Sequence, residues 1–309
     1  VQAENGALAF HTVTVTVAAV APKAILAFGF SRTDNPAMPA DYTGVISGTN
    51  ITVTMSVDVD RSDLAAWFTT SGTGVTFGTQ VQASGITRNN FLTNNVLTVH
   101  ASDNSTTNYL ITVIPHDFAG GSGTEIDPYL VSNSRELDRV RWYAGSHFRQ
   151  TASFSLTNYA NWVPIGVLGA PFFGSYDGDN HVIDGLTINR PTSNFQALFG
   201  LAAGAALRDI ILTNIAITGY NRTGGLAGRL TNSCQVSGCI VQGTIAGNGR
   251  VGGLAGDAYG GAVVRSSATV TMTGAGLLGG LLGAMDQGAT VAFCHTRGSI
   301  TATAFGEGG

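Results

Sequence analysis

The pentapeptide GGLAG occupies residues 224–228 and recurs at 252–256, and GGLLG follows at 279–283. QALFG at 196–200 stands 28 residues before the first of these (196 to 224) and is a degenerate earlier copy. A unit of 27 or 28 residues (252 to 279, 224 to 252) with two short strand patterns cannot bury its apolar face alone, so it must stack on its neighbours. We therefore expect residues 196–309 to form a right-handed parallel β-helix.

The pentapeptides are expected to supply the corners and the core of each coil. Leu226, Leu254 and Leu281 would form an inward ladder, with the flanking glycines at positions where a Cβ would clash. These structural glycines are Gly224, Gly225, Gly228, Gly252, Gly253, Gly256, Gly279, Gly280 and Gly283. A phosphate-binding loop needs a strand before it, a helix after it and usually a lysine. The repeats have neither a helix pattern nor a lysine, which argues against nucleotide binding.

The composition excludes further classes of function. Charged residues make up only 11% of the 309 residues and the net charge is −4, so no basic surface for nucleic acid is expected. No apolar run approaches the roughly 20 residues of a membrane helix, so we expect no membrane insertion. The chain starts at Val1 rather than Met and ends on GEGG, where another repeat would begin. We expect both ends to be cuts through a longer protein.

Residues 24–114 have the pattern of an antiparallel β-sandwich. Segments 50–59, 96–101 and 108–114 alternate apolar and polar residues, are rich in Thr and Val, and are separated by turn residues. Residues 1–23 are expected to hold the tail strand of a preceding module and a linker, because their Thr-Val strand resembles the last strand of the sandwich.

Residues 115–127 are a turn-rich linker, and 128–195 are expected to lead into the solenoid and cap it. The one good helix pattern is NSRELDRVRWYA at 133–144, where Asn133 can cap the helix and Glu136 completes a capping box. The predicted fold is therefore all-β: an antiparallel β-sandwich, then a right-handed parallel β-helix with one short capping helix near its start.

The later repeats share a second pattern beyond the glycines. The aligned steps are Val236-x-x-Cys239, Val264-x-x-Ser267 and Val291-x-x-Cys294. Cys239 and Cys294 would then lie two coils apart, about 10 Å, which is beyond the reach of a disulfide. We predict that both are buried free thiols, because a metal site with His295 lacks the necessary ligands.

A strand centred on Ile217, Ile245, Met272 and Ile300 follows in each repeat. Its apolar centre should point inward, which places the flanking residues outside in two columns. The outward hydroxyl residues are Thr218, Thr244, Thr271, Thr273, Ser299 and Thr301, with Ala216 and Ala246 as interruptions. Such a ladder could bind sugars or ice, whereas the alternative is that Thr simply suits exposed strand positions.

The densest polar cluster is SYDGDNHVID at 175–184. Asp177, Asp179 and Asp184 could offer oxygen ligands to Ca²⁺, but an Asp-Gly turn that feeds a strand explains the same residues and is favoured. The same alternative is favoured for Asp58, Asp60 and Asp63. We predict no cofactor and no metal.

Parallel β-helices also host polysaccharide-processing enzymes, which need two carboxyl groups roughly 5–10 Å apart. Asp257 and Asp286 differ in register by two positions. The arginines of the repeats are scattered along the sequence: Arg208, Arg222, Arg229, Arg250, Arg265 and Arg297. Without a convergent acid–base set we predict a protein that is not an enzyme, and a polysaccharide-processing enzyme stays an alternative.

The pentapeptides, with SGCIVQGTI at 237–245 and FCHTRGSI at 293–300, resemble the GLUG repeat of bacterial surface proteins. The middle copy has Ser267 where that family often has Cys. TGVISGTNITVTM at 43–55 and HASDNSTTNYLITV at 100–113 are similar to Ig-like or cadherin-like modules of bacterial envelope proteins. The resemblance implies an extracellular or cell-surface adhesin that binds a glycan or a host or matrix protein. The alternative in the same architecture is a structural stalk that binds nothing.

Overall fold

The computed structural model describes residues 21–303, and the strand predicted within residues 1–23 lies outside them. The chain divides into two compact units. The first comprises Val1–Asn35, Thr43–Val53 and Arg61–Val113, and the second comprises Pro36–Tyr42, Thr54–Asp60 and Ile114–Gly309. The structure is mostly β, with antiparallel sheets followed by a parallel β-solenoid of about six turns over 147–302, which confirms the predicted fold class.

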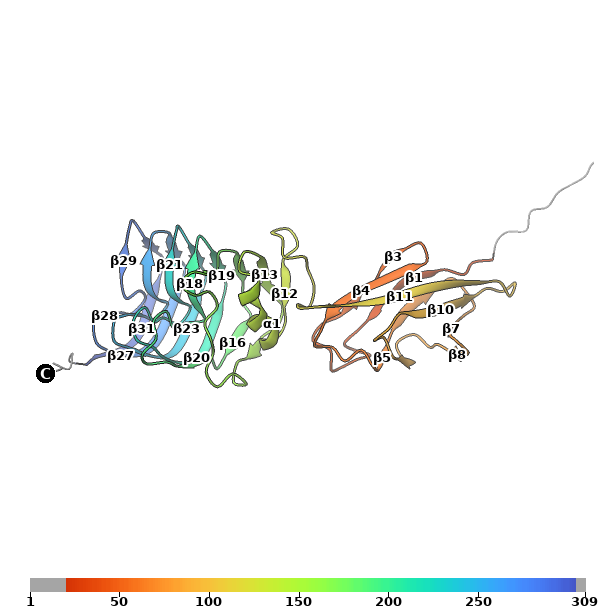
Figure 1. The fold of residues 1–309 in the computed structure, drawn as a ribbon, viewed down its shortest axis with the longest axis horizontal. Helices are drawn as coiled ribbons and strands as arrows, with labels where there is room; N and C mark the ends of the chain where they lie inside the picture. The colour runs from red at the N-terminus through yellow and green to blue at the C-terminus, as the bar shows by residue number, and fades with distance from the viewer. Residues whose placement is uncertain (1–20, 304–309) are drawn as a thin grey trace, which may run out of the picture. The chain divides into compact units, whose positions relative to one another are not determined.

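The N-terminal part is built from antiparallel sheets (Figure 1). The three-stranded sheet has the order β2-β1-β6, from β1 (Ile25–Phe30), β2 (Tyr42–Thr43) and β6 (Trp67–Thr70). The six-stranded sheet has the order β3-β4-β11-β10-β7-β8, from β3 (Val45–Ser47), β4 (Asn50–Ser56), β7 (Gly74–Phe77), β8 (Gln80–Val81), β10 (Asn95–His100) and β11 (Thr106–His116). β5 (Leu64–Ala65) pairs with β9 (Arg88–Asn89). Alternate residues of β4, Ile51, Val53 and Met55, are fully buried, as the period of two predicts.

The only helix of the described residues lies at the start of the solenoid. α1 (Ser134–Arg139) continues into the 3₁₀ turn η1 (Val140–Trp142), two residues short of the predicted end. Asn133 Oδ1 accepts hydrogen bonds from the N–H groups of Arg135 and Glu136, both at 3.0 Å, so the predicted cap is confirmed. The Glu136 carboxylate, however, accepts from the N–H and hydroxyl of Ser132 rather than from the N–H of Asn133. Leu137 and Val140 are fully buried in the solenoid core, which they cap.

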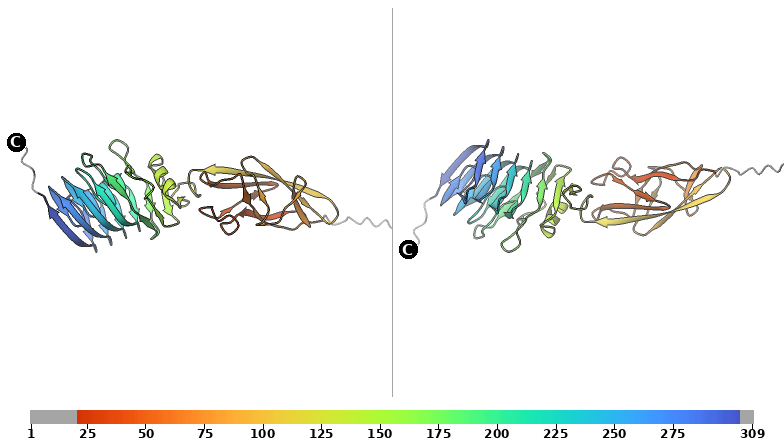
Figure 2. Two further views of the ribbon diagram at one scale, coloured as in Figure 1. Left: turned by 90° about the horizontal axis from the view of Figure 1, so that it is seen from below. Right: turned by 90° about the horizontal axis from the view of Figure 1, so that it is seen from above.

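One side of the solenoid is the β19 sheet, seven parallel strands in chain order (Figures 1 and 2). Its strands are β12 (Tyr129–Val131), β13 (His147–Gln150), β15 (Ser175–Asp177), β19 (Ala206–Arg208), β22 (Gln235–Ser237), β26 (Ala262–Val264) and β30 (Thr290–Ala292). The central residue of each short strand points inward. Phe148, Tyr176, Leu207, Val236 and Val263 therefore form one buried column.

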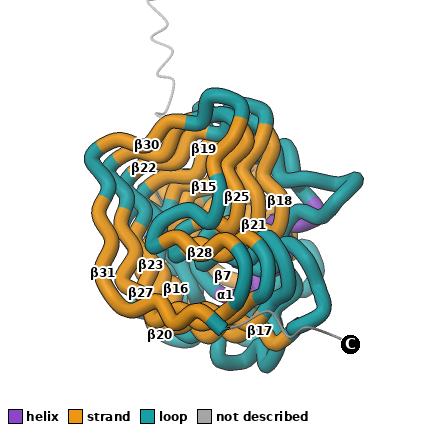
Figure 3. Tube along the Cα trace, turned by 90° about the vertical axis from the view of Figure 1, so that its left-hand side faces the viewer, coloured by secondary structure: helices purple, strands orange, loops and turns teal. Residues whose placement is uncertain are grey.

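A second side is the β20 sheet, also parallel, which Figure 3 shows beside the other sides with the coils seen end-on. Its strands are β14 (Phe154–Ser155), β16 (Val182–Asp184), β17 (Thr187–Asn189), β20 (Ile211–Thr218), β23 (Ile240–Gly247), β27 (Ser267–Gly274) and β31 (His295–Ala302). From β20 onward its strands have eight residues, and in β27 the alternate residues Ala268, Val270 and Met272 are buried. β31 pairs with β27 alone among the described strands, and each of its residues is exposed.

The third side is the β21 sheet, and the pentapeptides run into it. Its strands are β18 (Phe199–Ala203), β21 (Ala227–Thr231), β25 (Ala255–Tyr259) and β29 (Met285–Asp286), with the short pair β24 (Arg250–Gly252) and β28 (Leu277–Gly279) before it in the coil. Leu226 and Leu254 are fully buried, and the N–H of Leu254 donates to the carbonyl of Leu281 at 2.8 Å. The predicted ladder is buried at Leu226 and Leu254, whereas Leu281, in the last described coil, packs against the same core but is only partly buried. Phe199 pairs with Ala227, in the register expected if QALFG is the first copy.

The repeat glycines are required for space rather than for their dihedral angles. None of the nine has a positive φ. A Cβ on Gly252 would lie 2.6 Å from the amide nitrogen of Gly283, and one on Gly225 would lie 2.8 Å from the carbonyl oxygen of Gly253. Real Cβ atoms essentially never come so near backbone atoms, so a larger residue would push adjacent coils apart. This confirms the predicted reason for glycine at these corners.

The predicted alignment of the middle repeat is wrong by one residue. Val263, not Val264, pairs with both Val236 and Val291. Ser266, not Ser267, lies between the two cysteines, because its hydroxyl accepts from the N–H of Cys239 at 3.1 Å and its own N–H points to Cys294 Sγ at 3.5 Å. The cause is the turn before β26, which has two residues, Gly260 and Gly261, whereas the turn before β22 has three.

The cysteines are free, and two of the three are buried. Burial raises the pKa of Cys239 to about 12 and also raises that of Cys234. Cys294 is only partly buried, so the prediction that it is a buried thiol is wrong. It lies in the last described coil, where β30 and β31 each have a single neighbouring strand.

Candidate functional site

The register of the β20 sheet assembles the predicted hydroxyl columns. Ile217, Ile245 and Met272 pair in sequence and are at most 2% exposed, as the inward prediction requires. Ile300 continues the same column but is 49% exposed, because no described strand lies beyond β31. Residues on either side of this column point away from the core.

The outward columns begin one coil earlier than the sequence predicts. The first column is Thr187, Ala216, Thr244, Thr271 and Ser299, and the second is Asn189, Thr218, Ala246, Thr273 and Thr301. Thr187 and Asn189 were missed because β17 precedes the recognisable repeats. The signal that could have found them is the triplet Thr187-Ile188-Asn189, which has the same apolar centre as the later triplets. We call these ten positions the hydroxyl face.

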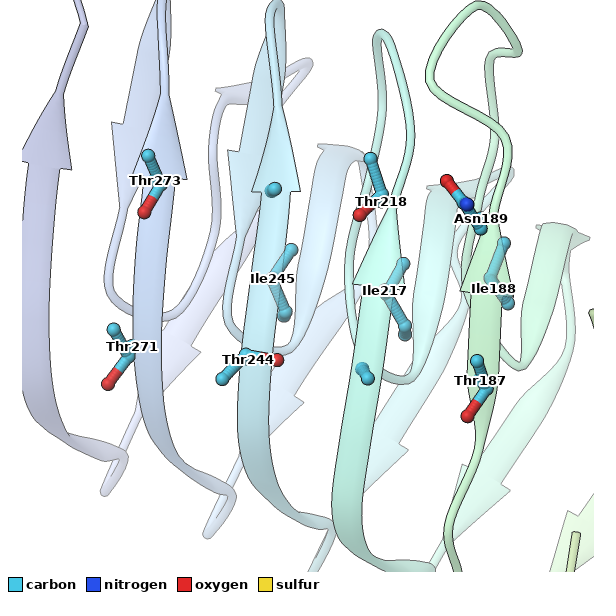
Figure 4. A pocket seen from close by; sticks show the side chains of 11 residues that line it. Thr187, Ile188, Asn189, Ile217, Thr218, Thr244, Ile245, Thr271 and Thr273 are labelled. Carbon is cyan, nitrogen blue, oxygen red and sulfur yellow. The ribbon is translucent and has the colours of Figure 1, made fainter. Parts of the chain in front are cut away.

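A shallow hollow of about 300 Å³ lies on four coils of the hydroxyl face (Figure 4). The residues that line it are Thr187, Ile188, Asn189, Ala216, Ile217, Thr218, Thr244, Ile245, Ala246, Thr271 and Thr273. The two alanines, expected only to interrupt the columns, alternate with larger side chains and so leave room between them. Ser299 and Thr301, although in the columns, do not line the hollow.

Several hydroxyls of this surface are free to bind an external group. Thr244 Oγ1 donates to the carbonyl oxygen of Ile215 at 3.4 Å. The hydroxyls of Thr218, Thr271 and Thr273 make no hydrogen bond with any residue from 21 to 303. Strands of neighbouring coils lie about 4.8 Å apart, so each column places its hydroxyls one or two coils apart on a backbone held by sheet hydrogen bonds.

Two of the three carboxylates considered for Ca²⁺ at 177–184 already have protein partners. Asp177 forms a salt bridge with Arg208 at 2.9 Å and also accepts from the N–H of Asp179 at 2.9 Å. Asp184 Oδ1 accepts from the hydroxyl of Thr213 at 2.6 Å and from the amide of Asn214 at 2.7 Å. Within the described part of the chain, no group of three His, Cys, Asp or Glu residues is arranged to hold a metal.

Three arginines that looked scattered in the sequence meet at one carboxylate, so that prediction is wrong for them. Arg222, Arg229 and Arg250 have nitrogen atoms 3.2, 3.5 and 3.2 Å from Oδ2 of Asp257. Arg229 pairs with Asp257 across the β21 sheet, while Arg222 and Arg250 come from the preceding corners of two successive coils. Arg222 and Arg250 occupy one position of the repeat in successive coils, and Arg229 and Asp257 occupy another. An alignment of the repeats therefore does not show that these residues meet. We call these four residues the arginine cluster.

No protein-family model matches the chain. A Gly-rich membrane protein of Evansella cellulosilytica is 36% identical over 124 residues, 38% of this chain and 14% of that protein. Halomucin of Haloquadratum walsbyi is 33% identical over 151 residues, 44% of this chain and 2% of halomucin. An immunoglobulin A1 protease of Streptococcus pneumoniae is 31% identical over 134 residues, 41% of this chain and 6% of the protease.

A solved IgA1 protease structure aligns with 84% of this chain and 21% of its own, at 18% identity and a TM-score of 0.45. The chain spans only 2% to 14% of the length of the three relatives above. It is therefore distantly similar to segments of large secreted, surface or membrane proteins of bacteria and archaea. Within residues 21–303, no helix is long and apolar enough to cross a membrane.

Proposed function

We propose that this chain is a segment of an extracellular surface adhesin, and that its hydroxyl face binds a neutral glycan without covalent chemistry. The observation that carries the proposal is the hollow on four coils, whose lining includes the hydroxyls of Thr218, Thr271 and Thr273, which have no partner among residues 21–303. Sugar hydroxyls can donate to and accept from Thr side chains, which have the same dual capacity.

The rigidity of the solenoid supports this function. The inward residues of the β20 sheet are close-packed and the hydroxyl columns are in register over five coils. A preformed array loses little conformational entropy on binding, and repetition of weak contacts along a glycan chain increases the total affinity. The distant similarity to large surface proteins is consistent with such a role.

We further propose that the repeats are of the GLUG kind and that the segment is not an enzyme. Asp257, one of the two acids weighed for catalysis, is only 1% exposed and is held by arginines rather than facing a second carboxyl group. Glycosidase chemistry requires a pair of carboxyl groups across a bound sugar. The remaining alternative, a stalk that binds nothing, uses the same fold, and only a binding measurement separates the two.

The test is binding of the full 309-residue chain to an array of glycans and matrix proteins. Thr271→Val with Thr273→Val removes two hydroxyls of the hollow while keeping the side-chain shape. Thr269→Val is the matched control, because Thr269 is exposed on the same strand but outside the hollow. Loss of two hydrogen bonds predicts about tenfold weaker glycan binding in the double variant and no change in the control. Binding to matrix proteins alone, or to nothing, would overturn the proposal.

A further inference from the structure

The arginine cluster lies on the outer face of the β21 sheet, a different side from the hydroxyl face. Asp257 is 1% exposed, whereas the side chains of Arg222, Arg229 and Arg250 are 22%, 25% and 33% exposed. The carboxylate is thus at the bottom and the three guanidinium groups are above it, in contact with solvent.

The cluster contains more positive charge than the buried acid requires. One arginine is enough to neutralise a carboxylate, and a bidentate pair is the strong form of that contact. Here three guanidinium groups share the single atom Oδ2 of Asp257, so two positive charges are in excess. Only Arg222 Nε and Arg250 Nη1 donate hydrogen bonds to it. No other side-chain nitrogen of these arginines donates to a residue within 21–303, so the outward N–H groups are free.

The guanidinium groups are held in place by their surroundings. Arg222 lies 5.2 Å from the centre of the Phe195 ring, and Arg229 lies 5.0 Å from that of Tyr259. The backbone of Arg222 has a φ of 57°, an uncommon conformation for a side chain of this size. Cationic groups fixed on aromatic faces are ordered before any ligand arrives, which lowers the entropy cost of binding.

A buried acceptor completes the arrangement. Asp257 Oδ1 is shielded from solvent and has no hydrogen-bond donor among the described residues. Such an atom is costly to leave unpaired, and a hydroxyl or a water beside a bound anion would satisfy it. Asp286 points to the same face one coil further, next to Tyr259, but forms no ion pair with the three arginines in the described structure.

We propose that the arginine cluster is an oxyanion site that binds the carboxylate or sulfate group of an acidic polysaccharide. The planar guanidinium fork matches both groups in charge and geometry. This site goes beyond the glycan binding proposed for the hydroxyl face and does not depend on it. It gives the solenoid a second surface, with selectivity for charged polymers.

The test measures binding of the full chain to immobilised dextran sulfate, hyaluronan and neutral dextran in the same buffered salt. Dextran sulfate supplies only sulfate groups and hyaluronan only carboxylates, so the two arms identify which anion is bound. Arg250→Gln and Arg229→Gln should each weaken binding to the preferred charged polymer about tenfold. Arg250→Lys keeps the charge beside Asp257 but loses the fork, and should weaken binding about threefold.

Arg265→Gln is the matched control, because Arg265 is an exposed solenoid arginine outside the cluster. This substitution removes one positive charge from the chain, as Arg250→Gln does. Its effect should stay below about twofold in screened solution. Circular dichroism spectra identify any variant that fails to fold, and Arg250→Lys then serves as the folded test. Equal losses in Arg250→Gln and Arg265→Gln, or no binding to either charged polymer, would overturn the proposal. Thr271→Val with Thr273→Val should leave this binding unchanged.

Discussion

Gly256 lies directly against the backbone of Arg222 in the preceding coil. A Cβ on Gly256 would be 2.5 Å from the carbonyl carbon of Arg222 and 2.7 Å from its Cα. The last glycine of the pentapeptide therefore makes room for a corner residue with a positive φ. Gly228 has the same relationship to Phe195, whose φ is 60°, and a Cβ on Gly283 would lie 2.9 Å from the carbonyl carbon of Arg250. The repeated glycine and the arginine cluster are thus two parts of one corner.

This contact predicts that Gly256→Ala destabilises the solenoid. The added methyl group would meet backbone, which cannot rotate away, and overpacking of this kind costs about 1–3 kcal/mol. The measurement is urea unfolding followed by circular dichroism. Gly74→Ala is the control, since a Cβ there has no heavy atom within 4 Å. Equal midpoints for both variants would show that the corner tolerates a side chain.

The leucine ladder should carry a large share of the coil's stability. Leu254→Ala is expected to lower the free energy of unfolding by about 2–5 kcal/mol, because Leu254 is fully buried. Leu277→Ala is the matched control in the same region, with a side chain 56% exposed and an expected effect within about 0.5 kcal/mol. The measurement is the midpoint of urea unfolding for each variant. A Leu254→Ala midpoint as high as that of Leu277→Ala would refute an inward ladder.

The thiols should react in the order of their exposure. At pH 8 we expect a disulfide reagent to modify Cys294 first, because it is partly exposed, while Cys234 and Cys239 stay protected. Burial raises the pKa of the Cys239 thiol to about 12, so almost no thiolate is present there at this pH. The absorbance of the thiolate released from the reagent gives the number of modified cysteines. Cys294→Ser is the control, because it lacks the thiol expected to react first. Fewer than three reactive thiols after unfolding would contradict the structure.

The stability of the solenoid should fall with rising pH through the titration of Glu136. Burial raises the pKa of this carboxyl above its ordinary value of 4.5. The folded state therefore holds the proton more tightly than the unfolded state. The stabilisation of the folded state by protonated Glu136 is fully present below about pH 4.5. It is lost as the pH rises through the raised folded-state pKa.

Glu136→Gln removes this titration while keeping an acceptor for the N–H of Ser132. The free energy of unfolding, measured in urea at several pH values, should therefore decline less for the variant than for the natural chain. If the free energy of unfolding changed with pH by the same amount in both proteins, Glu136 would not contribute to the pH dependence.

The sequence was sufficient for the architecture because the determinants are local and periodic. The spacing from Leu226 to Leu254 predicts the coil length, and the apolar centres Ile217, Ile245 and Met272 predict which face points inward. The cap at Asn133 follows from residue type and spacing alone.

The parts that could not be predicted depend on turns and on contacts between different positions of the coil. The turn before β26 has one residue fewer than the turn before β22, so Val263 and Ser266 lie one position earlier than the repeat spacing predicts. The apolar pattern of the strands does not show the length of a turn. The meeting of Arg222 and Arg250 at Asp257 requires knowledge of how corners stack in three dimensions. The sequence predicts Ala216 and Ala246 only as gaps in a ladder of hydroxyls, whereas in the structure they line a hollow.

The central claim, that the hydroxyl face binds a glycan, is tested most directly by threonine-methyl NMR of the full chain during titration with the neutral oligosaccharide that the array selects. The claim predicts shifts at Thr218, Thr271 and Thr273, which line the hollow, and none at Thr269 on the same strand. Shifts confined to residues outside the hollow, or no shifts at saturating oligosaccharide, would contradict it.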